Sequence, residues 1–343
     1  MKIPFNRPFF DNCEEEAVVQ VLRKGWVTQG PTTEEFEKRF AAWIGAPYCV
    51  AVNSCTAALF LALKALKLKQ GARVAVPSLT FTASAEVIVQ AGYTPVFVDV
   101  EEETFCIDSD DLDKQDVEAI VSVHLTGNQS IQRADVPIVE DSAHRIQRNS
   151  YRENLTCFSF YATKNMTTGE GGMIATHDPG LVQWFSKARR HGMTKDAWKR
   201  TATSSWEYTI EFCGWKMNTT DIQSAIGIEQ LKKLDEMNDK RLEIVSQYNL
   251  GFGLYRQGIH LYPIRVKNRD KFMTIMKEKG IGYSVHFLAL HKMLAYQKWN
   301  KRSLPITEQL SSEFVSLPLF PGMTKEEVDY IIYEVDKTSL RRP

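Results

Sequence analysis

Two stretches of the sequence decide the fold, PIVEDSAH at residues 137–144 and CFSFYATKNMTTGEGGMIATH at residues 157–177. Each begins with a short run rich in Val, Ile, Phe or Thr, as buried strands do. The first run ends at Asp141, and the second ends at Phe160, with Lys164 following in a turn. A charged group at the end of such an apolar strand needs a partner, because burying an unpaired charge is costly.

Runs of the same kind recur along the first half of the chain. They read CVAVNS (49–54), RVAVPS (73–78), TPVFVDV (94–100), EAIVSVHL (118–125), PIVEDS (137–142), LTCFSF (155–160) and GGMIATH (171–177). Helical patterns follow the first two runs, at residues 56–67 and 82–92. Strands that alternate with helices predict a mostly parallel sheet covered on both faces, and ligands of such sheets bind beyond the carboxyl ends of the strands.

The pattern changes near residue 220, where long amphipathic helices begin. Residues 220–249 read as one or two such helices, and Asp221 follows two threonines, which is typical of a helix start. The remainder holds a strand-like run at 260–266 and helical runs at 269–280 and 325–335. We therefore expect an α/β protein with a large domain over residues 1–235 and a smaller α+β domain over residues 236–343.

The composition weighs against several classes of protein. The 343 residues include 42 Lys+Arg and 42 Asp+Glu, so the formal net charge is zero, and we expect neither nucleic acid nor a membrane as a partner. No apolar run is long enough to span a bilayer, and the first ten residues do not resemble a signal peptide. The six cysteines form no CxxC pair. We expect free, mostly buried thiols in a cytoplasmic protein, and no metal site.

Three short motifs at predicted strand ends carry candidate site residues. In NSCTAAL (53–59) a helix opens after a strand, where free N–H groups favour an anion, although for this motif alone a capping Ser or Thr is the more common explanation. A protonated pyridine nitrogen would be a suitable partner for Asp141, with a helix cap as the plainer alternative. A desolvated Lys164 would have a lowered pKa and a free amine for imine chemistry, whereas most isolated lysines are surface residues. Ser159 offers a hydroxyl to a phosphate.

The later candidates are plainer still. Asn218 precedes the first long helix and reads as a loop or cap residue. His286 and His291, in HFLALH, lack metal spacing with any carboxylate and read as packed or pocket histidines.

Taken in order, the motifs resemble the DegT/DnrJ/StrS family of sugar aminotransferases, which use pyridoxal 5'-phosphate (PLP). The resemblance covers almost the whole chain. It is carried by residues 7–31, 54–63, 76–100, 123–128, 139–144, 157–176, 214–235, 285–291 and 316–324. It implies the type I PLP-dependent aminotransferase fold, with a large cofactor domain and a small C-terminal domain.

The resemblance also implies a cofactor role for each matching residue. Lys164 matches the lysine that forms a Schiff base with the cofactor. Asp141 matches the carboxylate that keeps the pyridine nitrogen protonated, so that the ring can accept electrons. Thr56 and the backbone of Cys55 match the turn that binds the phosphate, and Ser159 adds a hydroxyl there.

Five further positions match residues around the cofactor and the substrate. Phe81 matches an aromatic residue that stacks on the cofactor ring, and His144 takes the place of a Gln or His near the phenolic oxygen. Asn218 matches an asparagine that reaches the cofactor phosphate of the neighbouring subunit. The stretches around Thr28 and His286 resemble parts that border the sugar-nucleotide pocket.

The chain departs from the family pattern at three places. Cys55 stands where many members have Gly or Ala, and Ala289 replaces the usual Pro of the HFxPLH stretch. The segment 145–156 is shorter than in most members of the family and lacks their glycine-rich turn. This difference affects the prediction of the substrate and leaves the prediction of the cofactor unchanged. One branch of the family has histidine in place of the lysine and performs dehydration, and Lys164 argues against that branch.

We therefore expect a cytoplasmic, homodimeric aminotransferase with shared active sites. It would move an amino group from an amino acid, glutamate by family inference, to a keto group of a nucleotide-linked (6-deoxy) sugar, and so make a nucleotide-linked amino sugar. One alternative is an aminotransferase that acts on an amino-cyclitol or a small keto phosphate. Another is a non-catalytic regulator that keeps the fold as a ligand sensor. The nucleotide, the sugar and the choice between C3 and C4 stay open.

Overall fold

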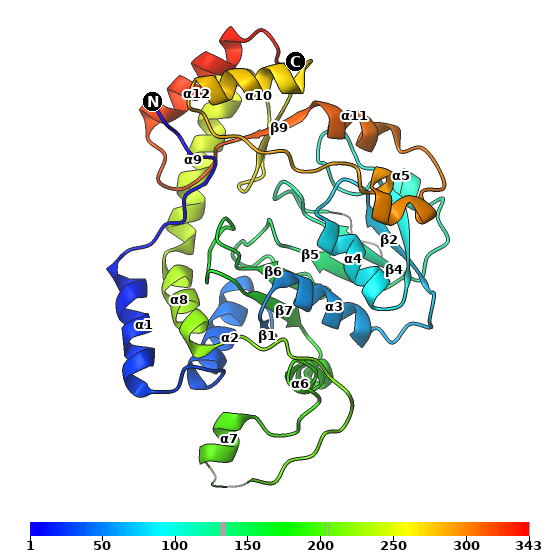
Figure 1. Cartoon of the computed structure of the whole chain (residues 1–343), viewed down its shortest axis with the longest axis vertical. Helices are drawn as coiled ribbons and strands as arrows, with labels where there is room; N and C mark the ends of the chain where they lie inside the picture. The colour runs from blue at the N-terminus through cyan, green and yellow to red at the C-terminus, as the bar shows by residue number, and fades with distance from the viewer. Residues whose placement is uncertain (131–134, 203, 205, 343) are drawn as a thin grey trace. The chain divides into compact units, whose positions relative to one another are not determined.

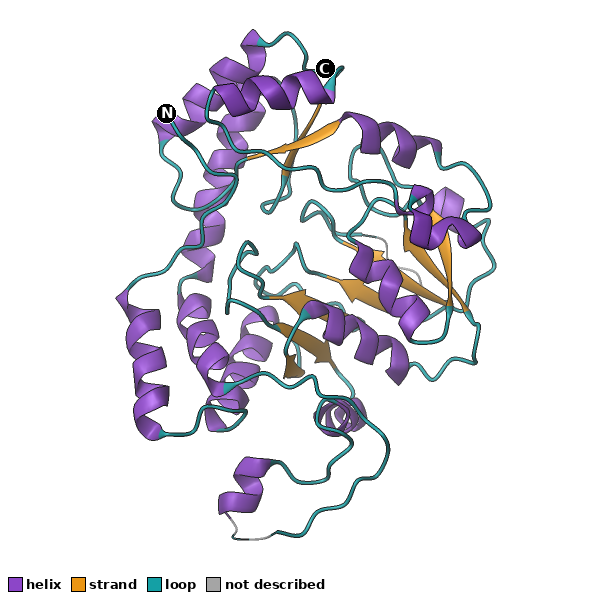
Figure 2. Ribbon diagram, viewed as in Figure 1, coloured by secondary structure: helices purple, strands orange, loops and turns teal. Residues whose placement is uncertain are grey.

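The computed structural model describes residues 1–130, 135–202, 204 and 206–342, which form two compact units (Figures 1 and 2). Unit 1 comprises Met1–Phe9, Lys69–Ile138 and Glu236–Pro343, and unit 2 comprises Phe10–Leu68 and Val139–Asp235. Unit 1 thus combines the C-terminal part of the chain with two earlier segments. The division into a large domain over residues 1–235 and a small domain over residues 236–343 stays a prediction.

Seven strands of the described residues form one sheet, in the order β1-β7-β6-β5-β4-β2-β3. Their bounds are Tyr48–Val52 (β1), Arg73–Pro77 (β2), Thr94–Val98 (β3), Ala119–Val123 (β4), Ile138–Asp141 (β5), Leu155–Ser159 (β6) and Gly172–Thr176 (β7). The pairs β2–β3, β2–β4 and β5–β6 are parallel, whereas β7 runs antiparallel to both β1 and β6. The prediction of a mostly parallel sheet built from the seven apolar runs is confirmed.

Unit 2 also holds several helices. They are α1 (Asn12–Lys24), α2 (Pro31–Ile44), α3 (Cys55–Ala65), α6 (Pro179–Ala188), α7 (Ala197–Ala202) and α8 (Asp221–Lys232). The apolar helix α3 packs on β6 and β7, α6 packs on β1, and α2 packs on both β1 and α8. Helix α1, closed by an Asp11–Glu14 capping box and by left-handed Gly25, lies along α8 (Figure 1).

Strand direction brings three chain segments of unit 2 to the same edge of the sheet. Because β1 and β6 are both antiparallel to β7, they run parallel to each other, and β5 runs parallel to β6. The carboxyl ends of β1, β5 and β6 therefore share one edge. The residues at the ends of these three strands and directly beyond them include every cofactor residue predicted in this unit except Asn218.

Unit 1 holds β2, β3 and β4 together with a second, smaller sheet. Helix α4 (Thr82–Gln90) packs on β2 and β3, and β8 (Tyr262–Arg265) pairs antiparallel with β9 (Phe314–Leu317). Further helices are α5 (Ser109–Leu112), α9 (Leu234–Phe252), α10 (Arg269–Glu278), α11 (Pro305–Glu313) and α12 (Lys325–Lys337). The apolar faces of α9, α10 and α12 share one core with β8 and β9. Two short 3-10 helices, Leu290–Lys292 and Leu294–Trp299, precede α11.

The predicted amphipathic run at 220–249 is two helices, since α8 ends at Lys232 and α9 begins at Leu234. The sequence pattern did not indicate β9, because its four residues directly follow a helix. None of the helices in the described residues combines the length and apolar character needed to cross a bilayer.

Replacing Gly227 by Ala should destabilise the protein. Gly227 lies in α8, where an added Cβ would sit 2.5 Å from Cζ of Phe36, a fully buried side chain of α2. Overpacking costs roughly 1–3 kcal/mol, which exceeds the ~0.5–1 kcal/mol that Ala gains over Gly inside a helix. Thermal unfolding of the Gly227→Ala protein measures the effect, and adding Phe36→Leu should restore part of the loss. A raised melting temperature in Gly227→Ala alone would contradict this account of α2–α8 packing.

Candidate active site

An acid and an amine interact at the carboxyl edge of the sheet in unit 2. Asp141 is the buried last residue of β5, and Lys164 lies in the turn after β6, where its N–H donates to the Tyr161 carbonyl at 3.0 Å. Desolvation lowers the pKa of the Lys164 amine to about 8, and the negative charge of Asp141 opposes this shift. A lysine so placed can both release and accept a proton near neutral pH.

A cysteine thiol completes this cluster. The Cys55 Sγ donates to Asp141 Oδ1 at 3.9 Å, and the Ala143 N–H donates to the same oxygen at 3.1 Å. Burial, followed by the nearby Asp141 charge, raises the pKa of Cys55 well above its ordinary value. The thiol therefore stays neutral beside the carboxylate, so the departure from Gly or Ala at this position adds no second negative charge.

The start of α3 lies at the same edge and is shaped to receive an anion. Ser54 caps the helix by accepting from the Ala57 N–H at 3.1 Å, and the first-turn N–H groups of Cys55 and Thr56 have no acceptor within the helix. Gly172 of β7, which pairs in register with Ser159 of β6, lies against the start of α3. A Cβ on Gly172 would lie 2.5 Å from the Ser54 carbonyl carbon, so only glycine permits this close approach.

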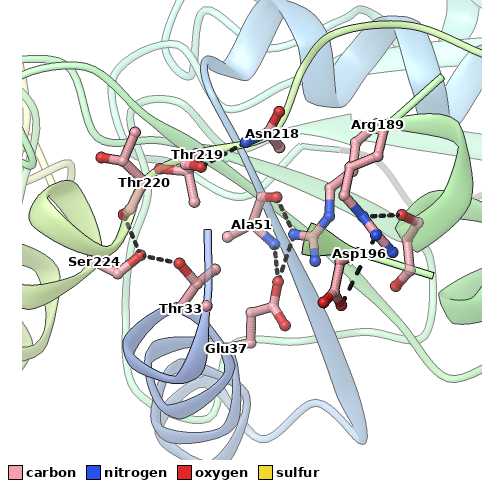
Figure 3. Close-up of polar contacts among 12 residues, drawn as sticks. Thr33, Glu37, Ala51, Arg189, Asp196, Asn218, Thr219, Thr220 and Ser224 are labelled. Carbon is pink, nitrogen blue, oxygen red and sulfur yellow. Dashed lines mark hydrogen bonds and ion pairs between the residues drawn. The ribbon is translucent and has the colours of Figure 1, made fainter. Parts of the chain in front are cut away.

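Three further predicted residues of unit 2, His144, Thr28 and Asn218, lie in loops next to β5, α2 and α8. His144 is buried in the turn that follows β5. The Thr28 carbonyl, just before α2, accepts from the Asp221 N–H at 3.2 Å. The Asn218 Oδ1 accepts from Lys216 Nζ at 2.6 Å, and its Nδ2 donates to the Thr219 carbonyl at 2.9 Å (Figure 3).

An ion pair between the buried Arg189 and the half-buried Glu37 supports the segment that leads to Asn218, and the sequence did not reveal it. Arg189 donates from Nη1 to Glu37 Oε1 at 2.6 Å and also to the Ala51 carbonyl (Figure 3). The Met217 N–H donates to the Arg189 carbonyl at 2.9 Å, and the Met217 carbonyl accepts from the Asn53 N–H at 2.9 Å. Glu37 and Arg189 are far apart in the sequence, and no motif links them, so the pair emerges only from the fold.

The other two predicted residues, Phe81 and His286, belong to unit 1 and lie near each other there. Phe81 starts α4 with an exposed side chain, and its ring centroid is 5.6 Å from that of Phe287. The His286 ring is 5.0 Å from Phe287, and its Nδ1 hydrogen-bonds to Ser316 Oγ at 3.0 Å. The structure thus gathers Cys55, Asp141, Ser159 and Lys164 in unit 2, and Phe81 and His286 in unit 1.

Two neighbours of His286 have clear structural roles in unit 1. His291 is buried and pairs through Nδ1 with Ser78 Oγ at 2.7 Å and through Nε2 with Glu308 Oε1 at 3.3 Å. Ala289 donates its N–H to Ser311 Oγ at 2.9 Å. The proline that the family usually has at this position carries no N–H and could not donate this hydrogen bond.

The short segment at residues 145–156 folds onto the end of α2. The Asn149 and Tyr151 N–H groups donate to the carbonyls of Trp43 and Ile44 at 3.2 and 3.1 Å. The Arg148 guanidinium lies 5.2 Å from the Trp43 ring centre and pairs with Asp235.

Comparison with known proteins decides the family. The model of the DegT/DnrJ/EryC1/StrS aminotransferase family matches residues 9–336. The chain belongs to this family. The predictions of the family and of its aminotransferase fold are confirmed.

Individual relatives match along nearly their whole length. The spore coat polysaccharide biosynthesis protein SpsC of Bacillus subtilis (strain 168) is 38% identical over 374 residues, covering 97% of this chain and 96% of SpsC. Spr1654 from Streptococcus pneumoniae, described as a sugar aminotransferase and solved in its PMP form, is 32% identical with a TM-score of 0.90, covering 98% and 99%. Helicobacter pylori PseC, an aminotransferase in the biosynthesis of pseudoaminic acid, is 26% identical with a TM-score of 0.87, covering 98% and 99%.

The lowered pKa of Lys164 predicts how acylation of its amine depends on pH. In protein with no small molecule bound, acylation of Lys164 should rise with pH and reach half its maximum near pH 8, because only the neutral amine reacts. Asp141→Asn removes the charge that raises this pKa, so its curve should lie at lower pH. Mass spectrometry of the labelled peptide gives both curves. Glu140→Gln is the control, since this carboxylate bonds to Asn154 and Thr156. Identical curves in all three proteins would show that Asp141 does not act on Lys164.

Proposed function

We propose that the protein transfers an amino group from an amino acid, glutamate, to a keto group of a nucleotide-linked sugar. The chain is a PLP-dependent aminotransferase, in agreement with its family and with Spr1654, which is known in a PLP form. The observation that carries the proposal is the Lys164 amine, with its pKa lowered to about 8, beside the buried Asp141 carboxylate. The sugar substrate is supported by SpsC, which serves polysaccharide biosynthesis, and by PseC, which serves the biosynthesis of pseudoaminic acid.

The residues of unit 2 fit the cofactor that the family uses. Bound PLP supplies an electron-accepting ring that lets a hydrogen leave the adjacent carbon as a proton. The Lys164 amine would hold the cofactor's aldehyde carbon until a substrate amine takes its place there, and the released amine would then carry a proton between the cofactor carbon and the sugar carbon. Asp141 would face the pyridine nitrogen, where its negative charge favours the protonated form of the ring.

The anion site at the start of α3 would hold the cofactor phosphate. The Cys55 and Thr56 N–H groups and the Ser159 hydroxyl would donate to it, aided by the positive end of the α3 dipole. His144, three residues beyond Asp141, would hydrogen-bond the phenolic oxygen, and Phe81 would stack on the ring.

Two stretches would border the substrate, one around Thr28 and the other around His286. Thr28 belongs to the loop at residues 26–31, between α1 and α2.

The free cysteines support a reducing compartment, so we propose that the enzyme is cytoplasmic.

The purified enzyme should convert glutamate to 2-oxoglutarate beyond a single turnover only when a nucleotide-linked keto sugar is present. A panel of acceptors tests this, with 3-keto and 4-keto nucleotide sugars beside amino-cyclitol ketones and small keto phosphates. Lys164→Ala should abolish turnover, because no other group is expected to move the proton, whereas the exposed Lys69→Ala should not. Turnover with a cyclitol or keto phosphate alone would replace the proposed substrate. An absence of turnover with every acceptor would favour a ligand sensor.

We also propose that the enzyme is a homodimer whose active sites are shared between subunits. Asn218 would reach the cofactor phosphate of the neighbouring subunit, where an amide adds a donor without adding charge. The Asn53–Met217 and Met217–Arg189 hydrogen bonds support this role, because they hold the backbone immediately before Asn218. A two-fold axis then produces two equivalent sites.

Mixed dimers test the shared site. Lys164→Ala and Asn218→Asp chains should each be inactive alone, the second because it places a negative charge beside the phosphate. Co-expressed, they should regain up to about half the activity per mixed dimer, since one of its two sites carries neither defect. No recovery in an isolated mixed dimer would show that each site lies within one chain. The two parent homodimers, purified in parallel, are the controls.

A further inference from the structure

Asp221 has a buried carboxylate that does not serve its own helix. It is the first residue of α8, and 2% of its surface is exposed. The cap of α8 is Thr220, whose hydroxyl accepts from the Gln223 N–H at 3.2 Å. The Asp221 carboxylate is therefore free to serve another part of the unit.

That other part is the start of α2. Asp221 Oδ1 accepts from the Gly30 N–H at 2.7 Å, the Thr33 N–H at 3.0 Å and the Thr33 hydroxyl at 2.7 Å, and Oδ2 accepts from the Thr32 N–H at 3.2 Å. Helix α2 has no cap of its own, because its N-cap residue is Gly30 and its first residue is Pro31. Asp221 thus caps α2 from another helix, and its negative charge lies at the positive end of the α2 dipole.

The same residue closes the loop that precedes α2. Its N–H donates to the Thr28 carbonyl at 3.2 Å, so Asp221 contacts the loop through both backbone and side chain. Within the loop, Trp26 Nε1 donates to the Gln29 carbonyl at 3.1 Å. A Cβ on Gly30 would lie 2.5 Å from Trp26 Nε1 and 3.0 Å from the Asp221 carboxylate, so the turn is packed tightly around these groups.

Two hydroxyl groups also join the start of α2 to the start of α8. Thr33 Oγ1 and Ser224 Oγ are 2.9 Å apart, and Ser224 Oγ donates to the Thr220 carbonyl at 2.9 Å (Figure 3). Thr220 lies two residues beyond Asn218. The start of α8 therefore connects the loop around Thr28 with the segment that carries Asn218.

We infer that Asp221 is a positioning residue for the amino acceptor: it holds the Trp26–Pro31 loop in the conformation that receives the keto sugar. The inference rests on the proposed function, in which the stretch around Thr28 borders that substrate. Asp221 itself is enclosed by backbone N–H groups and acts through the loop. Its loss should weaken recognition of the acceptor and leave the reaction with the amino donor unchanged.

The chain offers a matched control in Asp178. This residue caps α6, a helix that also begins with proline, and its carboxylate accepts from the Gly180 and Leu181 N–H groups at 2.6 and 3.3 Å. Asp178→Asn and Asp221→Asn therefore make the same change beside the start of a helix that begins with proline, but only Asp221 also contacts the loop around Thr28. In Asp221→Asn, an NH₂ group replaces one acceptor oxygen and faces N–H groups that need an acceptor.

Kinetics of the two half-reactions separate a positioning role from a merely structural one. With the acceptor that the wild type uses best, Asp221→Asn should raise the KM roughly ten- to a hundredfold, as misplaced binding groups do. Single-turnover reaction with glutamate, followed by the cofactor absorbance, should stay within about twofold of wild type, and Asp178→Asn should match wild type in both assays. Equal losses in both half-reactions, or an equal KM rise in Asp178→Asn, would overturn the inference.

Hydrogen exchange tests the loop without any substrate. Amides of residues 26–33 should exchange at least tenfold faster in Asp221→Asn holoenzyme than in wild type, with no such change in Asp178→Asn. Unchanged exchange would overturn the inference even if KM rises. Faster exchange in a protein that aminates no nucleotide-linked sugar would support the loop's dependence on Asp221 and would refute the proposed function instead. Should Asp221→Asn fail to fold, Thr33→Val removes one donor to Asp221, and the same shifts are expected at smaller size.

Discussion

Three strands of unit 2 end at one edge of the sheet, because β1 and β6 both run antiparallel to β7 and β5 runs parallel to β6. This shared direction is the constraint on which the candidate site depends. Cys55 and Thr56 follow β1, Asp141 closes β5, and Ser159 and Lys164 come at and after the end of β6. Ladder hydrogen bonds hold each strand end, so these groups are arranged before any ligand arrives. Gly172 completes the arrangement, since any larger residue would push β7 away from the start of α3.

The electrostatics of this edge follow from burial. Desolvation favours the neutral Lys164 amine and the nearby Asp141 charge favours its protonated form, and the net result is a pKa of about 8. A group with that value can exchange protons near neutral pH, which an exposed lysine does poorly. Cys55 contributes a thiol whose pKa is raised, so it packs against Asp141 as a neutral donor.

Two other carboxylates of unit 2, the half-buried Glu37 and the buried Asp221, accept hydrogen bonds from backbone N–H groups. Glu37 accepts from the Ala51 N–H at 2.8 Å and pairs with Arg189, whose carbonyl accepts from Met217. Asp221 caps α2. Together they hold the chain on both sides of Asn218. A removed carboxylate would leave several buried N–H groups without an acceptor, which costs about 1–3 kcal/mol for each group.

The sequence by itself determined the seven strands of the large sheet, their order along the chain, the class of that sheet and the residues at the strand ends. Short apolar runs that end at Asp141 or lead into the turn with Lys164 carry that information locally, and the ordered motifs added the family. Only the tertiary structure decided that Asp221 caps α2, that Arg189 pairs with Glu37 and that Gly172 must lack a side chain. These contacts join residues that are distant along the chain, and each is a matter of close approach in space, so no local pattern of residue types distinguishes them from ordinary cap, surface or turn residues.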